Sequence, residues 1–332
     1  MNETVHKKDT KRLVIAVLIL IVFSILSLML GSTFISLNSI LSYIIDPISS
    51  PDQFTIEVLR LPRIILAIVA GAALGVSGLI LQNVLKNPIA SPDIIGVTGG
   101  ATFGAVAFIA FLGDISVHWL PAFSLTGAAV VMMILISFQK KGNIQPTTLV
   151  IIGIALQTLF MALVNGTLVL TKQLAASKAY TWLVGSLSGA TFESSLILGL
   201  FIVCTLPLLI IVLPRMKVSV MHDNVATGLG VKINQTRLIQ MVITTILAGA
   251  AISFVGNIGF VGLISPHIAK ALIKGNYLKR LLMSAIFGAL SIVIADLIGR
   301  TVFLPKEVPA GVFIAAFGAP FFIYLLLTVK KL

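Results

Sequence analysis

Long uncharged, apolar stretches follow one another along almost the whole chain, and short polar segments separate them. An α-helix needs about 20 apolar residues to cross the hydrocarbon core of a membrane, and each stretch is close to that length or above it. The pattern predicts ten membrane-spanning helices. They lie near residues 13–34, 61–85, 94–112, 117–138, 147–170, 191–213, 236–255, 260–275, 279–303 and 309–329.

The longest uncharged stretch in the second half of the chain has to be interrupted. Residues 238–269 hold no Asp, Glu, Lys or Arg over 32 positions. A single helix of that length would measure about 48 Å, which exceeds a hydrocarbon core of about 30 Å. Gly256, Gly259, Gly262 and Pro266 lie in this stretch. Because glycine and proline interrupt helices, we expect a long helix followed by a short one.

The first uncharged run, from Leu13 to Ile45, follows a basic segment. It is too long for the hydrophobic region of a signal peptide, which spans about 7–15 residues, and it ends without an A-x-A cleavage pattern. We therefore expect a retained first helix, preceded by a short cytoplasmic segment, residues 1–12.

The composition agrees with a membrane protein. The 332 residues include 23 Lys or Arg and 11 Asp or Glu, so 10% are charged, and 58% are hydrophobic. Soluble domains carry about 25% charged residues. No polar stretch reaches the roughly 50 residues of a separate domain. The sequence therefore predicts a single all-α, polytopic transmembrane domain over residues 1–332 and excludes a soluble enzyme held by an anchor.

The basic residues orient the chain. With ten helices both termini lie on one side, and 17 of the 23 Lys and Arg residues fall on that side. The positive-inside rule makes this side cytoplasmic. The net charge of +12 therefore reflects orientation in the bilayer, and we expect no nucleic acid as a partner. The six basic residues predicted on the outer side are Arg60, Arg63, Lys172, Lys178, Arg300 and Lys306.

A short pattern recurs at a constant offset of 178 residues, and the two copies fall on helices predicted to run in opposite directions. Inverted repeats of this kind are typical of transporters, whereas a chance recurrence of Ala and Gly is the alternative. The first copy comprises Ala70, Gly71, Ala72, Ala73, Gly78 and Pro88, and the second comprises Ala248, Gly249, Ala250, Ala251, Gly256 and Pro266.

Few residues inside the predicted helices could carry chemistry. Asp296 is the only acid well within one, and Arg300 follows one turn later. The two can form an intrahelical ion pair, which we favour, or Asp296 can serve a proton relay. The single cysteine, Cys204, lies in an apolar run, and we expect it to be buried.

Catalytic motifs are missing from the sequence. It contains no GxxxxGK[ST] phosphate loop, no HExxH zinc motif and no GxSxG nucleophile elbow. We therefore expect no enzyme activity, and uphill transport would take its energy from a partner. Two rival classes are an ion-coupled secondary transporter and an intramembrane enzyme. The first normally needs carboxylates at membrane depth, and the second needs paired acids, a Ser/His arrangement or a metal cluster.

Several strings together resemble the iron-siderophore and cobalamin family of ABC importer permeases. The family's blocks RLPR, NPxAxPDxxGV, FxGLxxPHIxK and ExPxG with GxPxF occur here in the family's order and cover nearly the whole chain. Two departures are mild, because Lys86 and Lys270 stand where arginine is common and keep its charge. The strings that carry the resemblance are residues 59–101, 180–190, 223–231, 254–270 and 296–327.

The resemblance implies a type II ABC importer permease in the cytoplasmic membrane of a prokaryote. Such a subunit pairs with a second permease, identical or related, and the pathway lies at their interface. Two ATPase subunits, which use ATP and Mg, drive transport, and an extracytoplasmic binding lipoprotein delivers an iron(III)-siderophore complex. Cobalamin and haem are alternative cargoes. This chain itself would bind no cofactor and no metal.

The resemblance also assigns a docking role to three arginines. Arg60 and Arg63 of RLPR, with Arg300, would receive acidic residues of the binding protein, because charge complementarity sets orientation and association rate. The alternative is local: Glu57 pairs with Arg60, Asp296 pairs with Arg300, and Pro62 only starts a helix.

The polar segment of about 214–234 resembles the family's coupling helix, which seats on the ATPase. Its acid at the start and its glycines at the end are typical of a short capped helix. We expect Asp223 to cap it and Val225, Ala226 and Leu229 to form its contact face; an ordinary amphipathic loop is the alternative. The coupling residues are Asp223, Asn224, Val225, Ala226, Thr227, Gly228, Leu229 and Gly230.

Two further groups of polar residues have less specific roles. Gln82, Asn83, Gln157 and Asn165 could line the pathway or could hydrogen-bond neighbouring helices. We expect structural turns at Asn87 with Pro88 and at Pro266 with His267. His267 lacks the companions of a metal site, and His118 and His222 are predicted loop residues.

Overall fold

The computed structural model describes residues 2–48, 50–113, 115–140, 145–221 and 223–329, and this part of the chain contains helices and loops but no strand. The α-helices are α1 (Asn2–Met29), α2 (Leu37–Ile45), α3 (Leu61–Val84), α4 (Val97–Phe111), α5 (Leu120–Lys140), α6 (Pro146–Leu170), α7 (Gln173–Val184), α8 (Phe192–Ser219), α9 (Asp223–Gly228), α10 (Ile233–Val255), α11 (Val261–Leu272), α12 (Tyr277–Thr301) and α13 (Ala310–Val329). A π-helical turn (Thr55–Arg60) leads directly into α3, and 3-10 turns precede α4 (Pro92–Ile95) and α5 (Val117–Trp119).

The all-α prediction and the positions of the ten spans are confirmed. Seven helices are long and apolar enough to cross a membrane, and they include α1, α3, α5, α6, α8, α10 and α12. Three shorter apolar helices, α4, α11 and α13, account for the remaining predicted spans. Helices α4 and α11, with 15 and 12 residues, are shorter than the core is thick, which is tolerated where irregular backbone is buried in protein.

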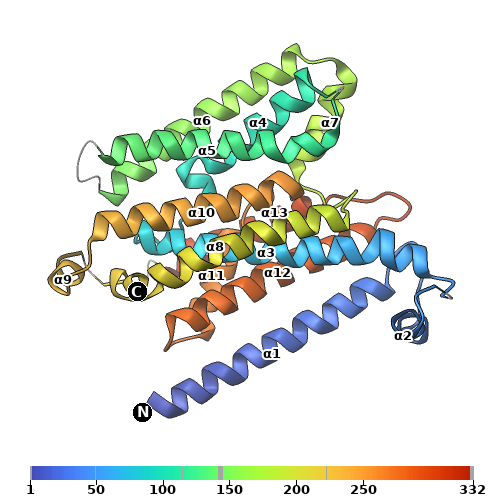
Figure 1. Cartoon of the computed structure of the whole chain (residues 1–332), viewed down its shortest axis with the longest axis horizontal. Coiled ribbons are helices and arrows are strands. Elements are labelled where there is room, and N and C mark those ends of the chain that lie inside the picture. The colour runs from blue at the N-terminus through green and yellow to red at the C-terminus, as the bar shows by residue number, and fades with distance from the viewer. Residues whose placement is uncertain (1, 49, 114, 141–144, 222, 330–332) are drawn as a thin grey trace.

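The helices run roughly along one axis, so the molecule has two ends. Figure 1 shows the start of α1, the end of α13 and the short helix α9 at one end of the bundle, and α2 and α7 at the other. The start of the first helix and the end of the last helix therefore lie at the same end of the bundle, as an even number of spans requires. We refer to the end with α9 as the cytoplasmic end and to the end with α2 and α7 as the outer end, following the distribution of basic residues.

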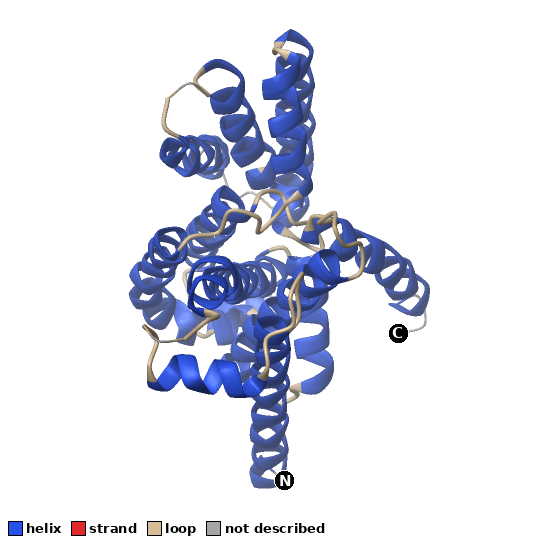
Figure 2. Cartoon of the chain, turned by 90° about the vertical axis from the view of Figure 1, so that its right-hand side faces the viewer, coloured by secondary structure: helices blue, strands red, loops and turns tan. Residues whose placement is uncertain are grey.

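The helices form two groups around α10. Seen along the bundle in Figure 2, a group made of α4, α5, α6 and α7 stands beside a larger group. Helices α4 and α5 contact α10, and α10 also packs on α3 and α8 of the larger group. Helix α10 therefore joins the two halves, and its central residues are buried.

Small residues allow the helices of the larger group to approach closely. A Cβ atom on Gly71 would lie 2.3 Å from the carbonyl oxygen of Gly288, and one on Gly75 would lie 2.2 Å from that of Ser284. Both neighbours belong to α12. Contacts of backbone with backbone at such residues are the main packing device available in lipid, where burial of apolar surface gives little advantage.

A proline contributes to the closest of these contacts. Pro266 lies inside α11 and has no N–H, so it cannot donate to the carbonyl oxygen of Gly262. That oxygen faces Gly78 of α3, and a Cβ on Gly78 would lie 1.8 Å from it. The predicted turn at Pro266 and His267 is therefore wrong. Both residues are helical, because α11 already begins at Val261.

The interruption of the long uncharged stretch is confirmed, and its bounds lie within one residue of the predicted ones. Helix α10 ends at Val255, and Gly256 takes a positive φ of 75°. Phe260, with φ of 63°, precedes the start of α11. The break therefore occupies residues 256–260. The other predicted turn is also confirmed, because Asn87 Oδ1 accepts a hydrogen bond from the Ile89 N–H at 3.1 Å just after α3.

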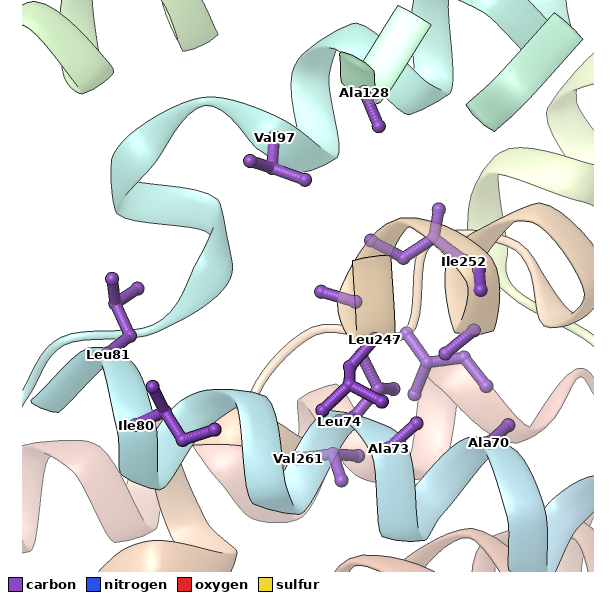
Figure 3. Close-up of a cluster of buried hydrophobic side chains, with 14 of the residues drawn as sticks. Ala70, Ala73, Leu74, Ile80, Leu81, Val97, Ala128, Leu247, Ile252 and Val261 are labelled. Atoms are coloured by element: carbon purple, nitrogen blue, oxygen red, sulfur yellow. The ribbon is translucent and has the colours of Figure 1, made fainter. Parts of the chain in front are cut away.

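Most of the Ala and Gly residues of the repeated pattern are buried in the core. Those of the first copy lie on α3, which ends before the exposed Pro88, and residues 248–251 of the second copy lie on α10. The two helices run in opposite directions and pack against each other. Figure 3 shows Ala70, Ala73 and Leu74 of α3 beside Leu247 and Ile252 of α10. Gly71 contacts α12, whereas a Cβ on Gly249 would lie 3.0 Å from Ala128 of α5. This arrangement supports an inverted repeat, with α12 and α5 in corresponding places.

Several elements were not predicted. Helix α1 begins at Asn2, so the charged segment 1–12 continues the first span. Helices α2 and α7 lie in segments that we expected to be loops, and α2 is capped by Ser36, whose hydroxyl accepts a hydrogen bond from the Ser39 N–H at 3.1 Å. Cys204 is exposed on α8, so its predicted burial is wrong.

Candidate functional site

At the outer end, an open pocket of about 650 Å³ contains the three arginines that the sequence singled out. Arg60 comes from the π-helical turn, Arg63 from the first turn of α3, and Arg300 from the last turn of α12. Glu57 and Glu307 also line the pocket. Five charged side chains from segments far apart in the sequence therefore meet here.

Arg63 bridges two acids in this pocket. Its Nε donates to Asp296 Oδ1 at 2.8 Å, and its Nη1 donates to Glu307 Oε2 at 2.9 Å. Asp296 also lies 3.6 Å from Arg300 Nε, which confirms the ion pair predicted within α12. The Asp296 side chain is buried, so it is enclosed by two cations. Such an enclosed carboxylate satisfies the condition under which ions are tolerated in a membrane helix.

The two other arginines are engaged with the end of α1. Arg60 is buried, with 3% of its surface exposed. Its Nη1 donates to the carbonyl oxygens of Leu28 at 2.5 Å and Met29 at 3.0 Å, and its Nη2 donates to that of Thr33 at 2.5 Å. The last carbonyl groups of a helix lack partners within it, and cations near them are favourable.

Arg300 has a similar task. Its Nη2 donates to the carbonyl oxygen of Ser27 and, at 2.5 Å, to the Ser27 hydroxyl. Of the three predicted docking residues, Arg63 is the one paired with an exposed carboxylate, since 49% of the Glu307 side chain is accessible.

The local alternative for these residues is supported only in part. Helix α3 has Pro62 among its first two positions, as predicted. Glu57, however, accepts a hydrogen bond from Gln53 Nε2 at 3.1 Å, and within the described part of the chain it makes no ion pair with Arg60. Sequence reasoning missed Glu307 as a partner of Arg63, although both lie on the predicted outer side.

At the cytoplasmic end, α9 forms the predicted short helix. Its C-terminus has the geometry of a Schellman motif: the Val231 N–H donates to Ala226 O at 3.0 Å, and the Gly230 N–H donates to Thr227 O at 2.9 Å. Gly230 takes a positive φ of 81°, which glycine adopts without strain. The predicted helix with glycines at its end is confirmed.

Asp223 ties α9 to two other helices. Its Oδ1 accepts a hydrogen bond from Lys86 Nζ at 2.6 Å, and its Oδ2 accepts one from Arg237 Nη2 at 2.6 Å. Lys86 follows α3, and Arg237 lies in the first turns of α10. Asp223 is the first residue of α9, so it lies within the helix and not at the capping position that we predicted for it. His222, predicted as a loop residue, lies outside the described residues.

The ionisation of Asp223 follows from these contacts. Its partial burial alone would raise the pKa, but the hydrogen bonds and charges of Lys86 and Arg237 outweigh it, and the pKa lies below its ordinary value. The carboxylate is therefore ionised at neutral pH. A depressed pKa contributes stability above the unfolded value of about 3.9, and this is lost as the pH falls through the folded pKa.

We expect Asp223→Asn to loosen α9 at neutral pH, because two ion pairs are lost while the shape of the side chain is kept. Amide hydrogen exchange of residues 223–230 should become several-fold faster than in the wild-type chain. The difference should be the same at pH 7 and pH 5, since the folded pKa lies below both. Glu193→Gln, at the outer end, is the control. Equal exchange in wild type and variant, or a difference that disappears by pH 5, would contradict this role of Asp223.

The face of α9 that points away from the chain is apolar. Val225 and Leu229 expose 51% and 63% of their surface. Ala226, which we expected on the same face, is buried, because it lies on the side of α9 that packs on its own chain. The predicted contact face is therefore corrected to Val225 and Leu229. Asn224, Thr227 and Gly228 are exposed around it.

Three of the four polar residues inside the helices hydrogen-bond between helices. Lys270 Nζ donates to Gln82 Oε1 at 2.6 Å, and the Gly99 N–H donates to Gln157 Oε1 at 2.7 Å. Asn83 Nδ2 donates to the Ser219 hydroxyl at 3.2 Å and to the carbonyl oxygen of Met216 at 3.3 Å.

The fourth of these residues, Asn165, is exposed on α6. It stands next to Gly166, around which a Cβ would meet nothing within 4 Å. Gln82 and Asn83 also line a cytoplasmic pocket of about 320 Å³ with Lys86, Lys270 and Tyr277. This pocket is therefore basic.

The described histidines do not belong to a metal site. His267 packs edge to face against Phe321, with ring centroids 5.8 Å apart, and His118 lies in the 3-10 turn before α5. Within the described residues, no three His, Cys, Asp or Glu side chains gather as they would around a metal ion.

Comparison with known proteins gives a match over nearly the whole chain. The model of the FecCD transport family matches residues 19–328. The chain is 38% identical to the Fe(3+)-citrate import system permease protein YfmE of Bacillus subtilis, over 98% of both chains. It is 37% identical to the achromobactin transport system permease protein CbrC of Dickeya dadantii, over 95% of this chain and 91% of the relative.

Solved structures share the fold. A metal-chelate type ABC transporter in an inward-facing conformation matches with a TM-score of 0.86 and 29% identity, over 97% of this chain and 100% of that one. The PsaBC complex of Streptococcus pneumoniae matches with a TM-score of 0.59 and 20% identity, which shows a similar fold. The arrangement of helices described above therefore also occurs in solved transporter structures.

Proposed function

The chain belongs to the FecCD transport family, and on that premise we propose that it is the permease subunit of an ATP-driven importer for a ferric chelate. It is a multi-pass protein of the plasma membrane and acts in transport rather than as an enzyme. The observation that carries the proposal is the family match over residues 19–328, together with relatives named for iron chelates over the same length.

The cargo that we propose is an iron(III)-siderophore or ferric citrate complex. The relatives are named for Fe(3+)-citrate, achromobactin and hydroxamate chelates. Iron travels inside its chelator, so the permease does not need to supply soft or nitrogen ligands to the metal. Cobalamin and haem are the alternative cargoes.

Uptake of radiolabelled iron tests the function and the class of cargo together. A strain lacking this chain, and the same strain complemented with it, would be offered ferric citrate, carboxylate siderophores and hydroxamate siderophores, with cobalamin and haem as controls. Loss and rescue of one ferric chelate class is the expected result. Rescue of cobalamin or haem alone would overturn the proposed cargo.

We propose that α9 couples the permease to ATPase subunits that hydrolyse ATP with Mg. The support is a short helix at the cytoplasmic end with Val225 and Leu229 exposed. The Asp223 bridge joins α9 to α3 and α10, so a displacement of α9 is transmitted to both. Helices α3 and α10 supply many residues of the core, so a movement of either helix shifts the helices packed against it.

We propose a second permease subunit, identical or related, on the side of α6. Asn165 is exposed there, whereas the other amide of this helix, Gln157, is partly buried and bonded to Gly99. An amide facing lipid is unfavourable, whereas one facing a partner helix or a water-filled path is not. The face of α6 with Asn165 and Gly166 therefore suits a pathway between two subunits. Gln82, Asn83 and Gln157 then support the helices around it.

We propose that an extracytoplasmic binding protein docks over the outer pocket. Arg63 is the residue best placed to receive an acidic side chain, because 13% of its side chain is exposed and its partner Glu307 is accessible. Arg60 and Arg300 hold the end of α1 against the pocket and add positive potential to it. All three arginines then contribute to docking: Arg63 receives the acidic side chain, and Arg60 and Arg300 position α1 and add positive charge.

A further inference from the structure

The two acids bound to Arg63 are held in different ways. Asp296 is a helical residue of α12, its side chain is buried, and Arg300 lies on its other side. Glu307 lies in the connection between α12 and α13, and 49% of its side chain is exposed. Removing Asp296 from its site would leave buried cations unpaired, which is costly. Glu307 is the accessible partner, with water beside it, so its bond to Arg63 is the more readily exchanged of the two.

The backbone around Glu307 is fixed, so its side chain can move by itself. The Val308 N–H donates to Gly299 O at 3.0 Å, and the Gly311 N–H donates to Gly185 O at 3.1 Å. These bonds hold the connection against α12 and against the end of α7. A carboxylate on such a segment leaves Arg63 by a change of side-chain rotamer, without unfolding the connection.

The charges in the pocket also point to an exchange. Arg60, Arg63 and Arg300 face Glu57 and Glu307 around the pocket, with Asp296 behind them. Arg60 and Arg300 are bonded to carbonyl oxygens of α1. An incoming carboxylate therefore finds one guanidinium that is paired with an accessible carboxylate, and that guanidinium is Arg63. Asp296 is shared between Arg63 and Arg300, so without Glu307 two guanidinium groups would have one carboxylate between them. A second resident carboxylate therefore has a physical role when nothing is docked.

We infer that Glu307 is an internal substitute for the docking carboxylate. It supplies the second carboxylate beside Arg63 while the binding protein is absent, and an acidic side chain of the binding protein takes its place when that protein docks. This inference rests on the proposed docking of a binding protein over the outer pocket. It adds a competitor within the permease itself, which lowers the affinity of the complex and speeds its dissociation after delivery.

The consequence can be measured with the complete transporter in nanodiscs. The probe is the soluble form of the extracytoplasmic binding protein that supports ferric chelate uptake with this permease. The Kd of its complex with the immobilised nanodiscs would be measured by surface plasmon resonance. Glu307→Gln should tighten binding by about threefold to tenfold, because the competitor loses its charge. Arg63→Gln should weaken binding by tenfold or more. In the Arg63→Gln background, Glu307→Gln should have no further effect.

The arms of this experiment separate the two ideas. Glu193→Gln, another acid at the outer end, is the matched control and should leave the Kd unchanged. If Arg63→Gln weakens binding while Glu307→Gln weakens it or leaves it unchanged, the substitute role of Glu307 is overturned and docking at Arg63 stands. If Arg63→Gln leaves the Kd unchanged, docking at this residue is itself overturned. Size-exclusion profiles of the variants show whether each is folded before its Kd is compared.

Discussion

Replacing Val225 and Leu229 with Asp together should reduce ATP-driven uptake of the ferric chelate at least tenfold while the permease stays folded in the membrane. Both side chains are exposed, Val225 on α9 and Leu229 directly after it, so neither belongs to the buried core. In the proposed complex they are buried against the ATPase, where a carboxylate would be desolvated without a partner. A residue that acts as a hot spot at the centre of an interface costs it about 2 kcal/mol or more when it is replaced.

The measurement pairs uptake of radiolabelled iron with recovery of the ATPase on the purified permease. Both should fall together in the double variant. Leu278→Asp is the matched control, because Leu278 is also an exposed leucine at the cytoplasmic end but belongs to α12. Normal uptake by the Val225 and Leu229 variant would rule out α9 as the coupling helix.

Gly78→Ala should destabilise the whole bundle. The added Cβ would lie 1.8 Å from the carbonyl oxygen of Gly262, and the neighbouring atoms are backbone, which cannot move aside as a flexible side chain would. Overpacking of a core usually costs about 1–3 kcal/mol, and a clash with backbone at this distance belongs at or above the upper end of that range. The contact joins α3 to α11, so separating the two helices disturbs the centre of the fold.

Thermal unfolding in detergent, followed by fluorescence-detected size exclusion, measures this effect. The melting temperature of Gly78→Ala should fall by several degrees or the protein should fail to accumulate. Gly199→Ala is the control on α8, because a Cβ there would meet nothing within 4 Å. Its helix should be unchanged or slightly more stable, since alanine is the better helix former. Equal melting temperatures for the two variants would refute the packing argument.

The fold could be predicted from the sequence because lipid imposes a simple rule on it. Backbone groups in the hydrocarbon core must be paired within a segment, so long apolar runs are helices. The ten spans, the break after Val255 and the turn at Asn87 followed from runs, glycines and prolines alone. The short helix α9 followed from its acid and its terminal glycines, which are local signals.

The partners of charged residues could not be predicted, because they are remote in the chain. Arg60 bonds to Leu28, 32 positions earlier, and Arg300 bonds to Ser27, 273 positions earlier. Local spacing predicted that Arg60 pairs with Glu57, but Arg60 donates instead to the free carbonyl groups at the end of α1. Glu307 and Arg63 are 244 positions apart, and only the packing of α12 on α3 brings them together.

The buried face of an apolar helix could not be predicted from the sequence either. Helix α8 is apolar all round, so the sequence does not show which side faces the core, and Cys204 was assigned to the wrong one. The helices α2 and α7 lie outside the predicted spans and are short, and isolated helices of that length are marginal without packing. Their formation depends on contacts with the outer ends of α1 and α4.

Transport in proteoliposomes tests the central claim most directly. The permease, purified with the ATPase subunits that it retains, would be reconstituted with ATP inside the vesicles, and the binding protein loaded with radiolabelled ferric chelate would be added outside. Accumulation of iron that requires ATP hydrolysis and persists when ionophores collapse every ion gradient is the predicted result. Accumulation that depends on an ion gradient and not on ATP would contradict the account and identify a secondary transporter.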